Sequence, residues 1–238
     1  MLSKNQIKSI TRLKQKKYRL QDQLFVAEGK KTIQELLNSN IELHHLYTTT
    51  LEFDVSDVLQ TKISDNELKK ISFLTNSNSA LAIFKIPKAL PITDGLIIAL
   101  DNVSDPGNLG TIIRLCDWFG VTDLVCNLDT VDCYNPKVIQ ATMGSISRVN
   151  ITYLNLKEYL IATKLNVFGA YMNGKTIYDL DLPESGIIIL GNEANGITEN
   201  LEPFINNKIA IPRFGKLKAT ESLNVANAAA ILLNEFRR

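Results

Sequence analysis

The feature that most constrains the fold of this chain is a regular alternation of short apolar runs and helical segments after residue 95. Six runs rich in β-forming residues lie at 96–100, 123–126, 150–154, 167–171, 187–190 and 208–211. Segments with helical periodicity separate most of them, at 108–119, 136–143, 156–164 and 222–236. Apolar strands that alternate with helices favour a mainly parallel sheet with helices on both faces.

The residues before this pattern predict a smaller α/β unit. The expected helices lie at 3–17 and 30–37, and the expected strands at 24–27, 42–48 and 80–86. Ser64 and Glu67 have the spacing of a capping box, which predicts a further helix towards Ile71. Two prolines within residues 87–91 suit a linker. We therefore expect a small domain at 1–86, a linker at 87–94 and a second domain at 95–238.

Composition and missing motifs exclude several classes of protein. Hydrophobic residues make up 45% of the chain, enough for a sizeable core, yet no apolar run approaches the ~20 residues that cross a bilayer. The N-terminus lacks an apolar signal-peptide core. The cysteines (Cys116, Cys126 and Cys133) are odd in number and lack C-x-x-C spacing, so we expect a reducing cytoplasm and no disulfide or metal site. Without G-x-G-x-x-G or G-x-x-x-x-G-K-[ST], a conventional dinucleotide fold and a P-loop are disfavoured.

The first 20 residues carry a concentrated positive charge. They contain seven lysine and arginine residues and no acidic residue, in a chain whose net charge is +1. Such a segment suits a phosphate-rich partner. It equally suits a solvated helix face with Ile7, Ile10 and Leu13 turned inward.

A polar segment follows the apolar run at 96–100. It reads Asp101-Asn-Val-Ser-Asp-Pro-Gly-Asn-Leu-Gly-Thr-Ile-Ile-Arg114. Asn108 stands at the entrance of the expected helix, where it can cap the helix or contact a ligand. Arg114 lies off the apolar stripe of that helix. It is therefore either a substrate contact or half of a surface pair with Asp117.

A second polar segment, Leu190-Gly-Asn-Glu-Ala-Asn-Gly196, ends another apolar run. Ligands of open α/β sheets lie outside the carboxyl ends of strands. Backbone approach at Gly191 and an acceptor at Glu193 would suit an adenosine there. A plain strand-to-helix turn is the alternative.

The third segment has Ile211 and Pro212 and then Glu221-Ser-Leu-Asn-Val225, before an apolar helix. Ser222 is a natural N-cap for that helix, and in the simplest interpretation it is nothing more. Asn224 and Asn227 share a polar face. Capping by Ser222 leaves this amide pair unexplained.

These three segments together resemble the SpoU-type, TrmH-like branch of the SPOUT methyltransferases. That family has an Asn-x-x-Asp-Pro-x-Asn-x-Gly-x-x-x-Arg segment, a Gly-Asn-Glu-x-x-Gly loop and an Ile-Pro…Glu-Ser-Leu-Asn-Val segment, and all three occur here in order. The N-terminal motif Phe25-Val-Ala-Glu-Gly-Lys-Lys31 looks like part of the family's small ribosomal-protein-like substrate-binding domain.

The resemblance implies a fold and a reaction. The α/β domain would end in a deep C-terminal trefoil knot and form a homodimer. It would use S-adenosyl-L-methionine to methylate a ribose 2′-hydroxyl in structured RNA, with no metal. Ribosomal RNA is the expected substrate, and transfer RNA is the second choice. A non-catalytic knotted RNA-binding or ribosome-assembly protein and a base methyltransferase of the same superfamily are the alternatives.

The resemblance also assigns roles to individual positions. The expected catalytic residues are Arg114, Asn108, Ser222, Asn224 and Glu193. The expected cofactor-binding residues are Gly191, Asn192, Gly196, Ile211 and Leu223. The N-terminal unit supplies the expected RNA-binding residues Lys14, Lys16, Lys17, Arg19 and Lys30. A guanidinium has a pKa above ~12, so Arg114 is expected to anchor the substrate phosphate and stabilise the developing alkoxide.

The chain departs from the family between Gly215 and Glu221. It has five residues there, 216–220, two of them lysines, where the family has a shorter loop. Arg213 stands where a methionine is common. We expect either a reshaped cofactor loop or extra cations that face the RNA.

Overall fold

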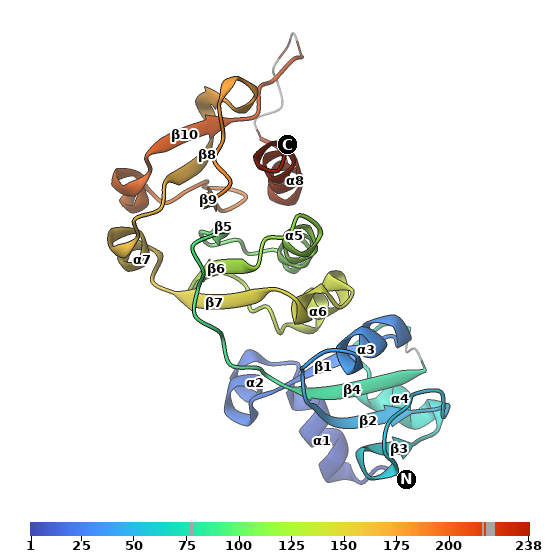
Figure 1. The fold of residues 1–238 in the computed structure, drawn as a ribbon. Helices are drawn as coiled ribbons and strands as arrows, with labels where there is room; N and C mark the ends of the chain where they lie inside the picture. The colour runs from blue at the N-terminus through green and yellow to red at the C-terminus, as the bar shows by residue number, and fades with distance from the viewer. Residues whose placement is uncertain (77–78, 216, 218–221) are drawn as a thin grey trace. The chain divides into compact units, whose positions relative to one another are not determined.

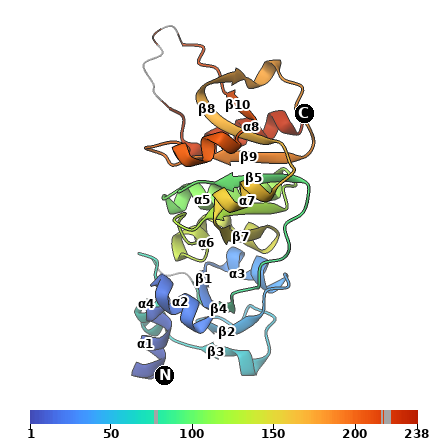
Figure 2. The ribbon, with the colours of Figure 1, turned by 90° about the vertical axis from the view of Figure 1, so that its left-hand side faces the viewer.

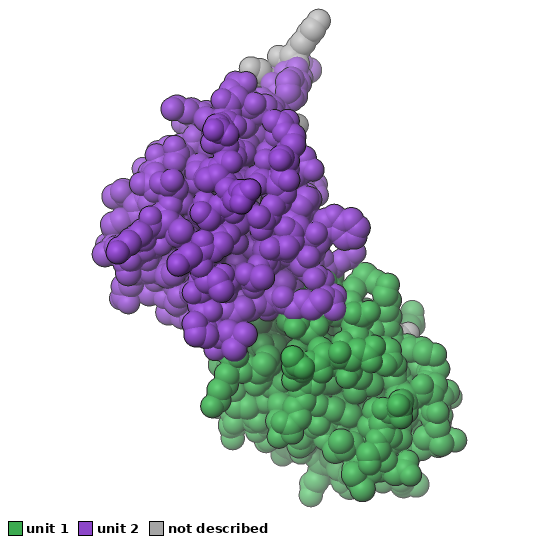
Figure 3. All heavy atoms as spheres, viewed as in Figure 1, with its two compact units in different colours: residues 1–88, 132–147 green, residues 89–131, 148–238 purple. Residues whose placement is uncertain are grey.

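The computed structural model describes residues 1–76, 79–215, 217 and 222–238. These residues form two compact units, coloured separately in Figure 3. The first unit comprises Met1–Lys88 and Asp132–Ser147, and the second comprises Ala89–Val131 and Arg148–Arg238. Residues 132–147 thus group with the N-terminal residues, although the sequence pattern predicts them in the second domain. The domain boundaries around the expected linker at 87–94 stay a prediction.

The first unit is built on a four-stranded sheet with the order β1-β4-β2-β3 (Figure 1). Its strands are β1 (Leu24–Glu28), β2 (Leu43–Thr48), β3 (Gln60–Lys62) and β4 (Ala80–Lys85). β4 pairs antiparallel with β1 and β2, whereas β2 and β3 run parallel. Its helices are α1 (Lys4–Arg12), α2 (Lys16–Asp22), α3 (Lys30–Leu37), η1 (Asp57–Leu59), α4 (Asp65–Ile71), α6 (Pro136–Thr142) and η2 (Ser145–Ser147).

The basic helix expected at 3–17 is wrong in its middle, because α1 ends at Arg12 and α2 begins at Lys16. The side chain of Arg19 explains the break. Its Nη1 donates to the carbonyl oxygens of Leu13 and Lys14, each at 2.8 Å. Those carbonyls would accept the next bonds of a continuous helix. The expected inward face is confirmed, since Ile10 and Leu13 are each 1% exposed.

The capping box at Ser64 is confirmed. Ser64 Oγ accepts a bond from the backbone N–H of Glu67, and the Glu67 carboxylate accepts one from the backbone N–H of Ser64. The N–H of Leu2 also donates to Glu67 at 2.6 Å, which ties the start of the chain to α4. Hydrogen bonds from the backbone of Ser64 and of Leu2 lower the pKa of Glu67 to about 2.

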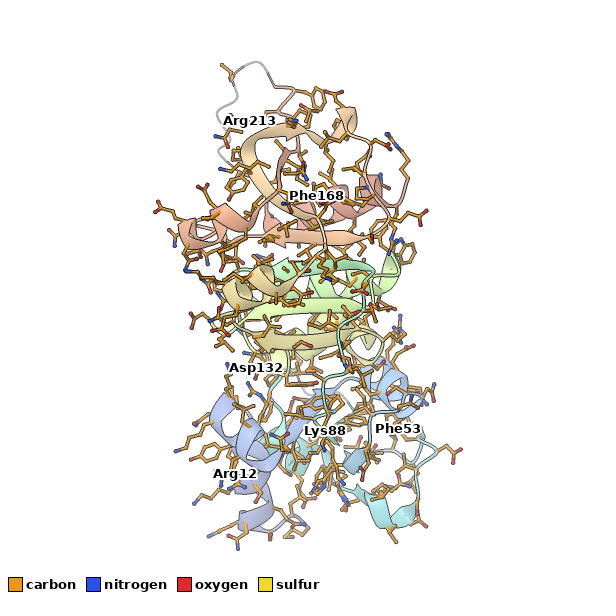
Figure 4. The ribbon with its side chains drawn as sticks, turned by 60° about the vertical axis from the view of Figure 1, so that its left-hand side comes forward. Arg12, Phe53, Lys88, Asp132, Phe168 and Arg213 are labelled. Carbon is orange, nitrogen blue, oxygen red and sulfur yellow. The ribbon has the colours of Figure 1, made fainter. Side chains whose placement is uncertain are left out.

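Residues 132–147 contact the N-terminal residues of the first unit through the packing of α6 on β1, and a ring contact and a buried ion pair add to it. The ring centroids of Phe25 and Tyr134 lie 4.9 Å apart. Asp132, labelled in Figure 4, forms an ion pair with Arg19, whose Nε lies 2.9 Å from Asp132 Oδ2. The two residues are 9% and 2% exposed. A contact between residues 113 positions apart leaves no local sequence pattern from which it could be predicted.

The second unit contains a six-stranded sheet of order β10-β8-β9-β5-β6-β7 in which every neighbouring pair is parallel. The strands are β5 (Leu96–Leu100), β6 (Asp123–Asn127), β7 (Asn150–Leu154), β8 (Val167–Thr176), β9 (Gly186–Leu190) and β10 (Asn207–Ala210). The helices are α5 (Pro106–Trp118), α7 (Leu156–Ala162), η3 (Ile177–Asp179), η4 (Glu199–Phe204) and α8 (Val225–Phe236). The predicted parallel α/β fold is confirmed.

Helices cover both faces of this sheet (Figures 1 and 2). α5 and α8 pack together on one face, and α7 packs with η4 on the other. All side chains of the central strands β5 and β9 are buried. Phe168 of β8, labelled in Figure 4, meets Phe236 of α8 edge-on, with ring centroids 5.1 Å apart. The burial of both central strands explains their unbroken apolar sequences.

Strand β8 extends five residues beyond the predicted end at 171. β10 pairs first with Phe168 and Gly169 and then with Lys175 and Thr176, so the register shifts between its two halves. The added part of β8 is mostly polar and half exposed, which explains why an apolar pattern did not reveal it.

Candidate functional site

The carboxyl ends of β5 and β9 bring two of the polar segments together. Leu100 pairs with Leu190 in register, and the N–H of Asp101 donates to the carbonyl of Leu190 at 2.9 Å. The chain then leaves β5 towards α5 on one face and leaves β9 towards η4 on the other (Figure 1). Adjacent strands whose connections leave to opposite faces create a crevice where α/β proteins bind ligands.

Asp101 fixes this strand end and was not singled out from the sequence. It is fully buried, and its Oδ2 accepts bonds from the backbone N–H and the hydroxyl of Thr198, at 2.7 and 2.6 Å. Its Oδ1 accepts a bond from Asn127 Nδ2 at 3.0 Å. One carboxylate therefore joins the ends of β5 and β6 to the segment after β9. A carboxylate directly after a fully apolar strand was the available sequence signal.

The loop after β9 is held closed by its own backbone. Asn192 and Gly196 exchange two backbone hydrogen bonds of 2.9 Å. A Cβ atom at Gly191 would lie 2.1 Å from the carbonyl carbon of Gly196, so only glycine fits there. Asn192 Oδ1 accepts a bond from the N–H of Ala194 at 3.0 Å, and its Nδ2 donates to the carbonyl of Asn102 at 2.7 Å. The side chain of Asn192 therefore fixes the loop.

A hydrogen-bond network links the three polar segments. Asn108 Nδ2 donates to Glu193 Oε1 at 2.9 Å, and Asn224 Nδ2 donates to Asn108 Oδ1 at 2.8 Å. The backbone and hydroxyl of Ser104 donate to Glu193 Oε2, each at 3.3 Å. Burial raises the pKa of Glu193, but the bonds from Asn108 and the backbone outweigh it and hold the pKa below its usual value. Glu193 is thus an ionised acceptor that holds the amide of Asn108, and Asn108 in turn holds the amide of Asn224.

The caps of the two flanking helices are compatible with the network, because Asp105 caps α5 in place of Asn108, and Asn224 caps α8 with its Oδ1 while its Nδ2 bonds Asn108. Asp105 caps α5, because its Oδ1 accepts the backbone N–H of Asn108 at 2.8 Å. Asn224 caps α8 through bonds from the N–H groups of Ala226 and Asn227. The expectation that Ser222 caps this helix is wrong. Ser222 lies two residues before the cap and is exposed.

Arg114 is exposed on α5 and does not join the network within one chain. Arg114 lies six positions after Asn108, which places it about 240° further around the helix at ~100° per residue. Of the two alternatives for Arg114, the surface pair with Asp117 is wrong, since Asp117 accepts bonds of 2.9 and 3.0 Å from Arg148. In the described part of the chain, no hydrogen bond or ion pair occupies the Arg114 guanidinium.

The remaining predicted cofactor residues flank the third segment. Ile211 is half-buried directly after β10, and Leu223 is 49% exposed just before α8. Of the longer loop expected at 216–220, only Leu217 belongs to the described residues, and it is exposed. The interpretation of that loop otherwise lies outside the described residues.

The predicted RNA-binding cations divide into two groups. Lys14, Lys16 and Lys17 are exposed. Lys30 is exposed too and forms an ion pair with Glu52. Arg19 is a correction: its guanidinium is buried and donates to Asp132 and to two backbone carbonyls, so it serves the fold of the first unit.

The described residues contain candidates for neither a metal-binding cluster nor a membrane-spanning helix. Within the described residues, no group of three or more His, Cys, Asp or Glu side chains is arranged to hold a metal ion. None of the helices in the described ranges is long and apolar enough to cross a membrane.

The fold is that of an open α/β protein, a class in which ligands bind outside the carboxyl ends of adjacent parallel strands. Comparison with known proteins gives the family. The chain belongs to the SpoU rRNA Methylase family, which matches residues 95–234, and residues 4–82 match the MRM3-like substrate binding domain. The resemblance found in the sequence is therefore confirmed.

Relatives match nearly the whole chain. The 23S rRNA (guanosine(2553)-2′-O)-methyltransferase RlmP of Bacillus subtilis is 30% identical, over 99% of this chain and 97% of its own. The structure of a Porphyromonas gingivalis protein, assigned as a TrmH-family RNA methyltransferase, has a TM-score of 0.92 and 37% identity over 100% of this chain and 99% of that one. An AdoMet-bound rRNA methyltransferase from Sinorhizobium meliloti has a TM-score of 0.88 and 28% identity, over 100% and 96%.

Proposed function

We propose that this protein uses S-adenosyl-L-methionine to methylate a ribose 2′-hydroxyl of ribosomal RNA. The observation that carries the proposal is the network of Glu193, Asn108 and Asn224, which joins all three polar segments at the ends of β5 and β9. The full-length relatives support the same reaction, because one is named for 2′-O-methylation of 23S rRNA and another binds AdoMet.

The residues around the crevice fit the cofactor. Asn102 Oδ1 is buried and has no hydrogen-bond partner in the described residues, so it offers an acceptor to the amino and hydroxyl groups of S-adenosyl-L-methionine. Bound there, the cofactor would supply an electrophilic methyl group on a sulfonium. The residues that we propose to hold it are Gly191, Asn192, Gly196, Ile211 and Leu223.

The network would position the ribose. Glu193 stays ionised and orients the amide of Asn108, which in turn orients the amide of Asn224. Ser222, exposed beside Asn224, would add a hydroxyl. The ribose hydroxyl must lose its proton as the methyl group transfers. Because a guanidinium is a weak base, Arg114 would bind the substrate phosphate and stabilise the developing negative charge.

We infer that the active enzyme is a homodimer. Arg114 and Trp118 are one turn apart on the exposed side of α5, and Trp118 is 83% exposed. A large exposed aromatic side chain suits a protein interface. Since Arg114 points away from the network of its own chain, a second copy would supply Arg114 to that network.

We also propose that the C-terminal part of the second unit forms the trefoil knot. β10 lies at one edge of the sheet, yet the following helix α8 returns to pack on α5. Threading of this return would hold Asn224 beside Asn108. The three cysteines are buried and none of them is part of a disulfide, which suits a reducing compartment, and we place the reaction in the cytoplasm.

Replacement of Arg114 tests the catalytic part of the proposal. Arg114→Ala should abolish methyl transfer to ribosomal RNA, while the dimer, cofactor binding and most RNA affinity remain. Arg148→Ala is the matched control, because Arg148 is an exposed arginine paired with Asp117 and outside the network. Turnover that survives Arg114→Ala would overturn the role of Arg114. A methyl group located on a base would overturn the 2′-O assignment.

A further inference from the structure

A cavity of about 170 Å³ lies in the first unit and contains no residue of the strand-end network. Val26 and Glu28 of β1 line it, together with Phe73 and Leu74 after α4. Lys137 and other residues of α6 line another side. A cavity of ~150 Å³ accepts a benzene ring. This one therefore has room for a flat ring system whose outer edge remains at the mouth.

Glu28 places a buried carboxylate at one end of the cavity. The residue is 8% exposed, so its carboxylate is largely withdrawn from water. Its Oε1 accepts the backbone N–H of Phe73 at 2.7 Å, and its Oε2 accepts the hydroxyl of Ser72 at 2.5 Å. Each carboxylate oxygen can accept two hydrogen bonds, so each keeps one acceptor site. Burial raises the pKa of Glu28, which marks the incomplete compensation of its charge.

The unused acceptors match one nucleobase. Guanine presents two adjacent donors, N1–H and N2–H, on its Watson–Crick edge, whereas adenine, cytosine and uracil each place an acceptor beside a donor there. Unpaired bases of RNA are commonly bound through this edge and by stacking on aromatic side chains. Phe73 supplies an aromatic side chain, and the exposed Lys137 supplies a cation for the attached phosphate.

We propose that the cavity bounded by Glu28, Phe73 and Lys137 binds an unpaired guanine base of the RNA. Glu28 accepts the two donors of the base, and Lys137 contacts its phosphate. The inference rests on the proposed function in one respect, namely that the partner of the first unit is RNA. It adds a base-specific contact to a unit whose exposed lysines would contact RNA phosphates, which are the same for every base.

Binding of short RNAs to the full-length protein tests this. The probes are fluorescein-labelled heptauridylates with a single central guanosine, adenosine, cytidine or uridine, which carry equal charge. Fluorescence anisotropy at one salt concentration should give a dissociation constant about tenfold lower for the guanosine probe, the ratio expected for hydrogen bonds to a charged acceptor. Equal binding of all four probes would overturn the proposal.

Substitutions of cavity residues test whether the preference for the guanosine probe arises in the cavity. Glu28→Gln should remove the preference for guanosine, and the control Glu42→Gln, at an exposed glutamate of the same unit, should keep it. Lys137→Ala should weaken the guanosine probe most, because the phosphate that Lys137 contacts belongs to the base held in the cavity. If circular dichroism shows that Glu28→Gln is unfolded, Gln140→Trp at the exposed side of α6 takes its place and should also remove the preference. A folded cavity variant that keeps the guanosine preference would contradict the proposal.

Methyl transfer to ribosomal RNA is measured separately on the wild-type protein. Methyl transfer without a preference for the guanosine probe would contradict the guanine-binding proposal and leave the proposed function intact. A preference for the guanosine probe without methyl transfer would contradict the proposed function and leave the cavity as an RNA-binding site.

Discussion

Replacement of Asp132 by alanine should strongly destabilise the first unit. Asp132 Oδ2 accepts bonds from two nitrogens of Arg19, and the Arg19 side chain is only 2% exposed. Alanine would leave a buried guanidinium without its counter-ion, although the bonds to the Leu13 and Lys14 carbonyls would persist. Breaking a buried pair on one side costs about 3–5 kcal/mol. We expect a decrease of this size in the free energy of unfolding.

Urea unfolding followed by circular dichroism measures that decrease, and hydrogen exchange at residues 132–147 should rise in parallel. The double variant Arg19→Met, Asp132→Leu removes both charges and should recover most of the stability, because an apolar pair of similar volume avoids the desolvation cost. Asp54→Ala, at an exposed aspartate of the same unit, is the control and should change stability by less than about 0.5 kcal/mol. A decrease below about 1 kcal/mol for Asp132→Ala, or a double variant as unstable as the single one, would refute the reasoning.

Three further predictions concern the cap of α8, the carboxylate of Glu67 and two exposed lysines of the first unit. Asn224→Ala should lower stability by about 1 kcal/mol in thermal unfolding because it removes the α8 cap, whereas Ser222→Ala should leave it nearly unchanged. Because the pKa of Glu67 falls from 4.5 to about 2 on folding, its contribution to stability is present above pH 4.5 and disappears as the pH falls towards 2. Glu67→Gln should flatten the stability profile in that window; an unchanged profile would contradict the shift. The double variant Lys14→Gln, Lys17→Gln should make the plot of log RNA affinity against log salt less steep. By analogy with duplex DNA, the slope should decrease in magnitude by up to about 0.9 for each phosphate that the protein no longer neutralises. An unchanged slope would mean that neither lysine contacts a phosphate.

The sequence predicted the parts of the fold that depend on local pattern. β5 and β7 occupy the predicted ranges because apolar strand residues are bounded by polar turns. The α4 cap follows from the three-residue spacing of Ser64 and Glu67, which is itself the hydrogen-bond geometry. The order of the strands in the sheet has no such local signal.

The errors arose where contacts between distant residues decide the structure. The sequence predicts Arg19 among the exposed cations, but its guanidinium is buried against Asp132, and its bonds to two carbonyls interrupt the predicted helix. Ser222 has a good capping side chain, yet Asn224 starts α8 because it also bonds Asn108 from another segment. Asp101 was overlooked because its partners lie 26 and 97 residues away.

The family motifs located the strand-end site better than the pattern of any single segment could. Asn108, Glu193 and Asn224 were assigned from three separate segments, and the structure brings them into one hydrogen-bond network. Arg114 is the exception, since it lies on another side of α5, and our proposal therefore has a second copy of the chain supply it.

Nucleoside mass spectrometry of ribosomal and transfer RNA from a deletion strain and its parent tests the central claim most directly. The proposed function predicts that one 2′-O-methylated nucleoside disappears from ribosomal RNA and is restored by the wild-type gene and not by the Arg114→Ala variant. An unchanged set of 2′-O-methylated nucleosides in ribosomal RNA, or the disappearance of a base-methylated nucleoside instead, would contradict it.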